Sequence, residues 1–118
     1  MNRYYSLKSQ NEIDGIFKKK NSVGNSYFAI YMQKHEHRHF KYAISIGKKY
    51  GNAVERNLVK RRIRYVLSKF KDDIKSDVSF VIVVKPSVST LEYNSILEHV
   101  SKLLQRAKLI EKEDRTNA

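Results

Sequence analysis

Three histidines at alternate positions form the one cluster in this chain that suggests metal chemistry. His35, His37 and His39 would share one face of an extended segment, where imidazoles can bind zinc or nickel. A metal-dependent nuclease could be built on such a site. The other interpretation is a polar hairpin loop, because no acidic or cysteine ligand completes the set. We favour the loop and expect no bound metal.

Other catalytic groups are scarce. Asp72 and Asp73 are adjacent, so their side chains point to different sides and lack the convergence of a hydrolytic pair. There is no cysteine, hence no thiolate nucleophile, disulfide or cysteine-bound zinc, which fits a reducing cytosol. No glycine-rich phosphate loop is present. We therefore expect no catalytic residue in the chain and a location in the cytoplasm.

A basic helix beginning at Asn52 is the strongest functional feature. Asn52 and Glu55 have the spacing of a capping box, which starts a helix. A buried stripe then follows at helical spacing, comprising Val59, Ile63, Val66, Leu67 and Phe70. Beside the stripe lies a row of polar and cationic residues: Arg56, Asn57, Lys60, Arg61 and Arg64.

The charge of this row points to a polyanion. Like charges four residues apart repel along a helix, whereas contact with phosphates releases counterions and favours binding. The 118 residues carry a net charge of +12, and residues 1–71 hold 17 lysines and arginines against 4 acidic residues. A solvated helix face is the plain alternative. We favour nucleic acid, bound through the first half of the chain.

Two aromatic residues are candidates for contact with unpaired bases. Phe17 and Tyr31 could form part of a groove wall on which bases stack. The ordinary interpretation is that both belong to the core. Tyr31 is the better candidate, since it carries a hydroxyl and lies on the opposite strand face from Phe28 and Ile30.

Helices and strands must position these groups. Residues Ser9 to Lys20 have the pattern of a short helix, and Asn21 to Ser26 that of a turn. Two alternating segments, Tyr27–Met32 and Tyr42–Gly47, predict strands that pair as an antiparallel hairpin. Val78–Lys85 is almost continuously apolar, which is typical of a strand buried on both faces.

The chain ends in an amphipathic helix that a second capping-box pair, Ser89 and Glu92, is expected to begin. The order αββαβα predicts an α+β two-layer sandwich with a small mixed sheet and about three helices. Residues 1–118 are expected to form a single domain, with a basic arm at 1–8 and a frayed tail at 111–118.

The run from Lys49 to Arg64 also carries a resemblance. It meets every fixed position of the pattern K-x-G-N-A-V-x-R-N-x-x-K-R-x-x-R and is therefore similar to the signature of the bacterial ribonuclease P protein family. The similarity extends more weakly from about Tyr5 to Leu109. It implies the same fold, with an unusual left-handed crossover through the basic helix where the general rule predicts a right-handed one.

The resemblance also implies a function in removing the 5′ leader of precursor tRNA. The partners are the catalytic RNA subunit and precursor tRNA, with Mg²⁺ bound mainly by the RNA, no protein partner and no membrane. The residues implied to contact the RNA subunit are Lys48, Lys49, Asn52, Arg56, Asn57, Lys60, Arg61 and Arg64. Those implied to contact the single-stranded leader, in a cleft between the first helix and the sheet, are Phe17, Tyr31 and Lys85.

Three positions depart from the family pattern. Ile13 replaces a common phenylalanine, Gly47 a common serine and Val84 a common arginine. These changes remove one stacking surface and one cation. Outside the family, the charge alone would suit a general nucleic-acid-binding module such as a ribosomal protein.

Overall fold

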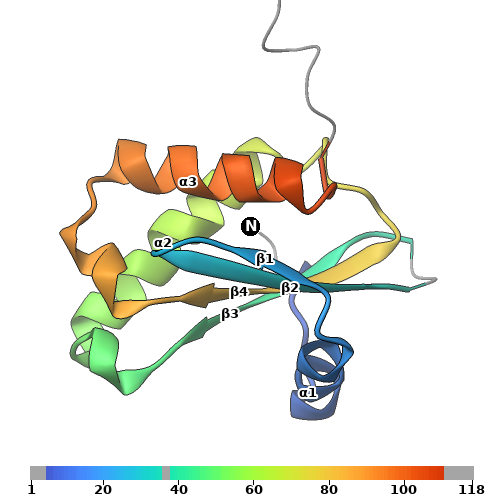
Figure 1. Ribbon diagram of the computed structural model, residues 1–118, viewed down its shortest axis with the longest axis horizontal. Helices are drawn as coiled ribbons and strands as arrows, with labels where there is room; N and C mark the ends of the chain where they lie inside the picture. Colours follow the sequence, from blue (N-terminus) through green and yellow to red (C-terminus); the bar gives the residue numbers. More distant parts are fainter. Residues whose placement is uncertain (1–4, 36–37, 111–118) are drawn as a thin grey trace, which may run out of the picture.

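The computed structural model describes residues 5–35 and 38–110, which form a mixed sheet with helices on both faces (Figure 1). The helices are α1 (Gln10–Lys19), α2 (Ala53–Lys69) and α3 (Tyr93–Arg106), with two short 3-10 helices, η2 (Lys48–Tyr50) and η3 (Pro86–Thr90). The strands are β1 (Ser22–Gly24), β2 (Phe28–Lys34), β3 (Lys41–Ile46) and β4 (Val78–Val84). The predicted α+β fold class is confirmed. The expectations for residues 1–4, for the tail at 111–118 and for His37 lie outside the described residues.

The sheet has the strand order β1-β2-β4-β3, with β4 at the centre of its three longer strands. β4 pairs antiparallel with β2 and parallel with β3. The predicted hairpin of β2 and β3 is therefore wrong. β4 is buried along almost its whole length, and such a strand needs neighbours on both sides, so it separates the two.

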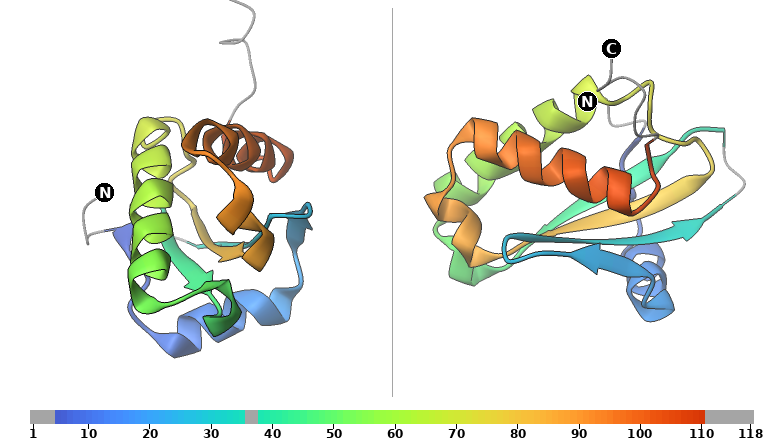
Figure 2. Two further views of the ribbon diagram at one scale, coloured as in Figure 1. Left: turned by 90° about the vertical axis from the view of Figure 1, so that its left-hand side faces the viewer. Right: turned by 45° about the horizontal axis from the view of Figure 1, so that its top comes forward.

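The two faces of the sheet are covered unequally. Figures 1 and 2 show α2 and α3 on one side of the sheet and α1 on the other. On the first side, which we call the closed face, large side chains such as Phe28, Phe80 and Ile82 are fully buried against α2 and α3. On the second side, the open face, Ile16 of α1 packs on Val81 in a much smaller cluster.

Local hydrogen bonding explains where α2 and α1 begin. The Asn52 Oδ1 accepts the Glu55 amide at 2.9 Å, and Glu55 Oε1 accepts the Asn52 amide at 2.9 Å. The predicted capping box is thus confirmed. At α1, the Ser9 hydroxyl accepts the amides of Asn11 and Glu12. Both caps satisfy donors that the first turn of a helix leaves unpaired.

Two local predictions are wrong. The segment expected to be only a turn contains β1, which pairs with β2 through Ser22 to Gly24. The capping box of Ser89 and Glu92 is absent, because Ser89 lies inside η3 and Glu92 caps α3 without a side-chain hydrogen bond. Pro86 begins η3 and presets its first turn, which delays the start of α3.

Residues 5–7 extend along the free edge of the sheet. The Leu7 amide donates to the Tyr42 carbonyl at 2.8 Å, and Ser6 forms a parallel bridge with Tyr42 of β3. Tyr5 stacks on Phe40 with 4.7 Å between ring centroids. This part of the predicted arm is therefore ordered. Within the ranges described, no helix has the length and apolar character needed to cross a membrane.

Candidate nucleic-acid interface

Four residues of the predicted row, Arg56, Asn57, Lys60 and Arg64, line two neighbouring hollows between α2 and β3. Arg56 and Lys60 line one of about 270 Å³ beside Ile46. Lys60 and Arg64 line the next, of about 240 Å³, which reaches Tyr42. Because Lys60 belongs to both, the hollows form a continuous cationic strip along the β3 edge. We call it the α2–β3 strip, and it consists of Arg56, Asn57, Lys60, Arg64, Ser6 and Tyr42.

Arg64 is held in this strip by the Tyr42 hydroxyl. Burial raises the pKa of Tyr42, while the charge of Arg64 and hydrogen bonds from Arg64 and Ser6 oppose that rise. Tyr42 is only 3% exposed. A buried phenol therefore fixes a guanidinium at the surface, where its remaining donors can meet phosphate oxygens. Sequence reasoning missed Ser6 and Tyr42, since neither is near Arg64 in the chain.

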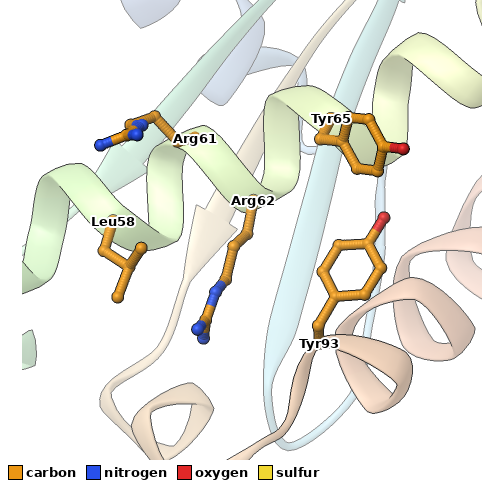
Figure 3. A pocket seen from close by; sticks show the side chains of 5 residues that line it. All are labelled: Leu58, Arg61, Arg62, Tyr65 and Tyr93. Carbon is orange, nitrogen blue, oxygen red and sulfur yellow. The ribbon is translucent and has the colours of Figure 1, made fainter.

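Arg61 lies on the other flank of α2. It lines a hollow of about 350 Å³ together with Leu58, Arg62, Tyr65 and Tyr93 (Figure 3). The row predicted from the sequence is thus divided between two surfaces. The helical spacing could have predicted this division. Arg61 lies about 100° further round the helix axis than Lys60, on a side that does not face β3.

The strip's cations are available for an external anion. Among residues 5–35 and 38–110, no carboxylate forms an ion pair with Arg56, Lys60 or Arg64; the ion pair present joins Lys102 to Glu98. An uncompensated row of this kind raises the local potential and attracts polyanions.

The residues before α2 lie at the same end of the strip. Lys48 and Lys49 are exposed in η2, directly before the exposed Asn52. The Oδ1 of Asn52 is engaged in the capping box, so its Nδ2 amide is the group that can donate to a ligand. Burial raises the pKa of the neighbouring Tyr50, against the effect of Arg62.

Phe17 and Tyr31 come together on the open face. Their ring centroids are 4.9 Å apart and the ring planes are 75° apart, an edge-to-face contact between α1 and β2. Both rings are half-buried, and both pack beside Val81 with Val83 and Ala43. Each ring thus serves the small cluster and keeps part of its surface exposed.

Lys85, the third residue predicted for the leader, lies away from these rings. Its amide donates to Tyr27, whereas Tyr31 pairs with Val81, four residues earlier on β4. That spacing corresponds to roughly 13 Å along a strand. The Lys85 ammonium donates to the Asn25 carbonyl at 2.5 Å, so it ties the β1–β2 turn to the end of β4.

The histidines have structural contacts. Both ring nitrogens of His35 are engaged: Nδ1 lies 2.6 Å from the Ser79 hydroxyl, and Nε2 lies 3.0 Å from the Ser76 carbonyl. A carbonyl can only accept, so Nε2 carries the proton and has no lone pair for a metal. His39 Nδ1 likewise donates to the Phe40 carbonyl. No group of three metal-binding side chains occurs in the portion described, from which His37 is absent.

His99 of α3 also has structural contacts. It is half-buried, with its ring 4.7 Å from Tyr27 and its Nδ1 3.3 Å from the Asn25 amide nitrogen. These contacts join α3 to the same β1–β2 turn that Lys85 holds.

The fold and the strip define a class of small, basic α+β domains with a surface suited to polyanions. Residues 1–108 match the family model of Ribonuclease P. The chain is 59% identical to the ribonuclease P protein component of Acholeplasma laidlawii, over 96% of this chain and 97% of that protein. It is 41% identical to that of Streptococcus equi subsp. equi, over 94% and 92%.

Solved structures agree with this result. The Staphylococcus aureus RNase P protein superposes with a TM-score of 0.85 at 30% identity, covering 91% of this chain and 98% of that one. The Thermotoga maritima protein, at 24% identity and a TM-score of 0.79, shows the same fold over 91% and 98%. The chain therefore belongs to the ribonuclease P protein family, and with it has a role in tRNA 5′ processing.

Proposed function

We propose that this chain is the non-catalytic protein subunit of a cytoplasmic ribonuclease P, and that it binds the catalytic RNA through the α2–β3 strip. The observation that carries the proposal is the continuous strip of Arg56, Lys60 and Arg64, whose charges have no carboxylate partner in the described part of the chain. Lys48, Lys49 and the Asn52 amide extend it at the start of α2. Arg61 would reach the same RNA from the other flank.

The open face is the surface proposed for the 5′ leader of precursor tRNA. Phe17 and Tyr31 present partly exposed rings there, and small residues such as Ala29 and Ala43 leave the sheet accessible beside them. Unpaired bases stack on such rings with ~1–3 kcal/mol each. Lys85 would act at the rim, about 13 Å further along β4, once its ammonium releases the Asn25 carbonyl.

In this proposal the RNA subunit performs the cleavage with Mg²⁺ that it binds itself. The protein neutralises repulsion between phosphates, which favours the compact RNA and its bound metal ions. It also adds contacts to the substrate. No nucleophile or general base of the protein is required.

The test is cleavage of precursor tRNA at low Mg²⁺ by a bacterial ribonuclease P RNA, with and without this protein. We expect cleavage at the mature 5′ end only when both are present. RNA binding with no gain in cleavage would leave a general RNA-binding module. Failure of the protein to bind the RNA at all would refute the proposal.

A protein-only reaction is the second candidate. A solved structure of a Staphylococcus aureus RNase P protein mutant, at a TM-score of 0.86 and 29% identity, is described as having defective mRNA degradation activity. We therefore include an unstructured mRNA with protein alone and, as a control, His37→Ala. If the protein alone degrades this mRNA and His37→Ala abolishes the activity, the chain would be a metal-dependent nuclease. It would then not be the non-catalytic subunit of an RNA enzyme.

A further inference from the structure

The outer flank of α2 carries an apolar stripe that the α2–β3 strip does not include. Val54, Leu58 and Tyr65 are 76%, 45% and 57% exposed, and they are the exposed large hydrophobic residues of the described chain. Their spacing of four and seven residues places them on one side of the helix. Apolar side chains gathered on one exposed stripe mark an interaction surface.

Part of this stripe forms one wall of the hollow between α2 and the first residue of α3. Figure 3 shows Leu58 at one end, the rings of Tyr65 and Tyr93 at the other, and Arg62 extending between them. Arg61 completes the lining of this space of about 350 Å³. No acidic side chain of residues 5–35 and 38–110 lines it. The hollow therefore combines apolar, planar walls with the guanidinium of Arg62, while the guanidinium of Arg61 points away from the rings at its edge (Figure 3).

Two further contacts describe its aromatic end. The Lys69 ammonium lies 5.1 Å from the centroid of the Tyr65 ring, which adds a third cation beside the hollow. The Tyr93 hydroxyl points toward Tyr65 (Figure 3), is buried, and has no hydrogen-bond partner among the residues described. Buried hydroxyls are normally satisfied, so this group has an unused capacity to bond.

We propose that this hollow, which we call the Tyr65 hollow, binds one unpaired nucleotide of the RNA subunit. The base would pack against Tyr65 and Leu58, and one flanking phosphate would meet the guanidinium of Arg62. The guanidinium of Arg61, which points away from the rings, would meet the RNA backbone outside the hollow. This inference rests on the proposed function, since it requires that the RNA subunit lie along α2.

The chemistry of the walls favours a nucleotide over other occupants. Arginines bind phosphates in a planar, bidentate manner, and an aromatic wall suits the flat face of any base. Arg61 is adjacent in sequence to Lys60 of the α2–β3 strip, so one RNA can span both flanks of the helix. A second copy of this chain is disfavoured, because each copy carries a net charge of +12.

The first test is the affinity of Tyr65→Ala for a bacterial ribonuclease P RNA, measured over a series of salt concentrations. We expect binding to weaken by about fivefold to 150-fold, the range that the loss of one stacked base implies. The salt dependence should not change, because stacking releases no counterion. Tyr65→Phe, the matched control, should bind within about twofold of the unmodified protein.

Arg62→Ala separates charge from stacking. It should lower the slope of log affinity against log salt by about 0.7–0.9, as expected for one lost phosphate contact. Unfolding in urea verifies that each variant is folded, and Leu58→Ser provides a second disruption of the hollow. If the unmodified protein binds the RNA and both Tyr65→Ala and Leu58→Ser bind equally well, this inference is wrong and the proposed function stands.

A crosslink tests the position directly. Since the chain has no cysteine, Tyr65→Cys can be labelled uniquely with a photoreactive azidophenacyl group. We expect crosslinks to one short RNA segment in the assembled particle, and none from the same label at Lys102→Cys on α3. Labelling in a cell extract that captures an acidic protein, with no RNA crosslink, would overturn the inference.

Discussion

The two faces of the central sheet differ in what covers them. The closed face carries Phe28, Phe80 and Ile82, all fully buried beneath α2 and α3. The open face carries Ala43, Val81, Val83 and the partly exposed Tyr31, and it has one short helix, α1, that buries Ile16 against Val81. Burial of large apolar groups dominates folding stability, whereas partly exposed aromatic rings can still meet a ligand. If the proposed function is right, one side of the sheet supplies most of the stability and the other side binds the leader.

The largest predicted effect is on the closed face. Phe80→Ala should lower the free energy of unfolding by about 3–5 kcal/mol, because it removes a fully buried ring and leaves a cavity. Phe80 stacks with Phe40 and Tyr42 at 5.9 and 6.2 Å between centroids, so the neighbours lose contacts as well. Urea unfolding followed by circular dichroism measures the change.

Two valines of β4 supply a matched control for this prediction. Val84 is 3% exposed on the closed face, and Val83 is half-buried on the open one. Val84→Ala should therefore lower the free energy of unfolding more than Val83→Ala does, by about 1 kcal/mol. Equal losses in the two variants would mean that both faces contribute equally to stability, which would contradict the difference between the closed and open faces.

On the open face the main effect should be on substrate binding. Tyr31→Ala should weaken binding of precursor tRNA to the assembled particle by ~1–3 kcal/mol, because one stacking ring is lost. The measurement is affinity for substrates with and without a 5′ leader. The leaderless tRNA is the control and should bind Tyr31→Ala normally. A loss that is equal for both substrates would place Tyr31 outside the leader site.

At the edge between the faces, the effect should appear in the salt dependence. Arg64→Ala should weaken binding to the RNA subunit and lower the slope of log affinity against log salt by about one unit. Lys102→Ala is the matched control, because Lys102 lies on α3 and pairs with Glu98 at 3.2 Å. An unchanged slope in Arg64→Ala would exclude Arg64 from the phosphate contacts.

The smallest predicted effect concerns alkaline stability. Burial raises the pKa of Tyr42 above the ordinary value of 10.0, so the unfolded chain loses this proton first as the pH rises. The resulting stabilisation is complete below pH 10.0 and is lost as the pH rises through the higher folded pKa. Tyr42→Phe removes the titrating group and should therefore lose less stability between pH 9 and pH 11, roughly one pH unit on each side of the free tyrosine pKa. The midpoints of urea unfolding across this pH range measure the loss of stability. An equal loss in Tyr42→Phe and the unmodified protein would contradict a raised pKa of Tyr42.

Features set by neighbouring residues were predictable from the sequence. The capping box of Asn52 and Glu55, the buried stripe of α2 and the burial of β4 all depend on spacing within one segment. The family signature is likewise a single run. Hydrogen bonds between residues three or four apart and the period of a helix or strand operate at this range, so sequence reasoning reaches them.

The tertiary structure alone decided how the segments combine. It placed β4 between β2 and β3, set Phe17 against Tyr31, and joined Tyr42 to both Arg64 and Ser6. It also divided the basic row, because Arg61 lines the hollow of Tyr65 and Tyr93 on the other flank of α2. These arrangements depend on which distant segments bury one another most completely. The spacing of residues within one segment does not specify which segments those are.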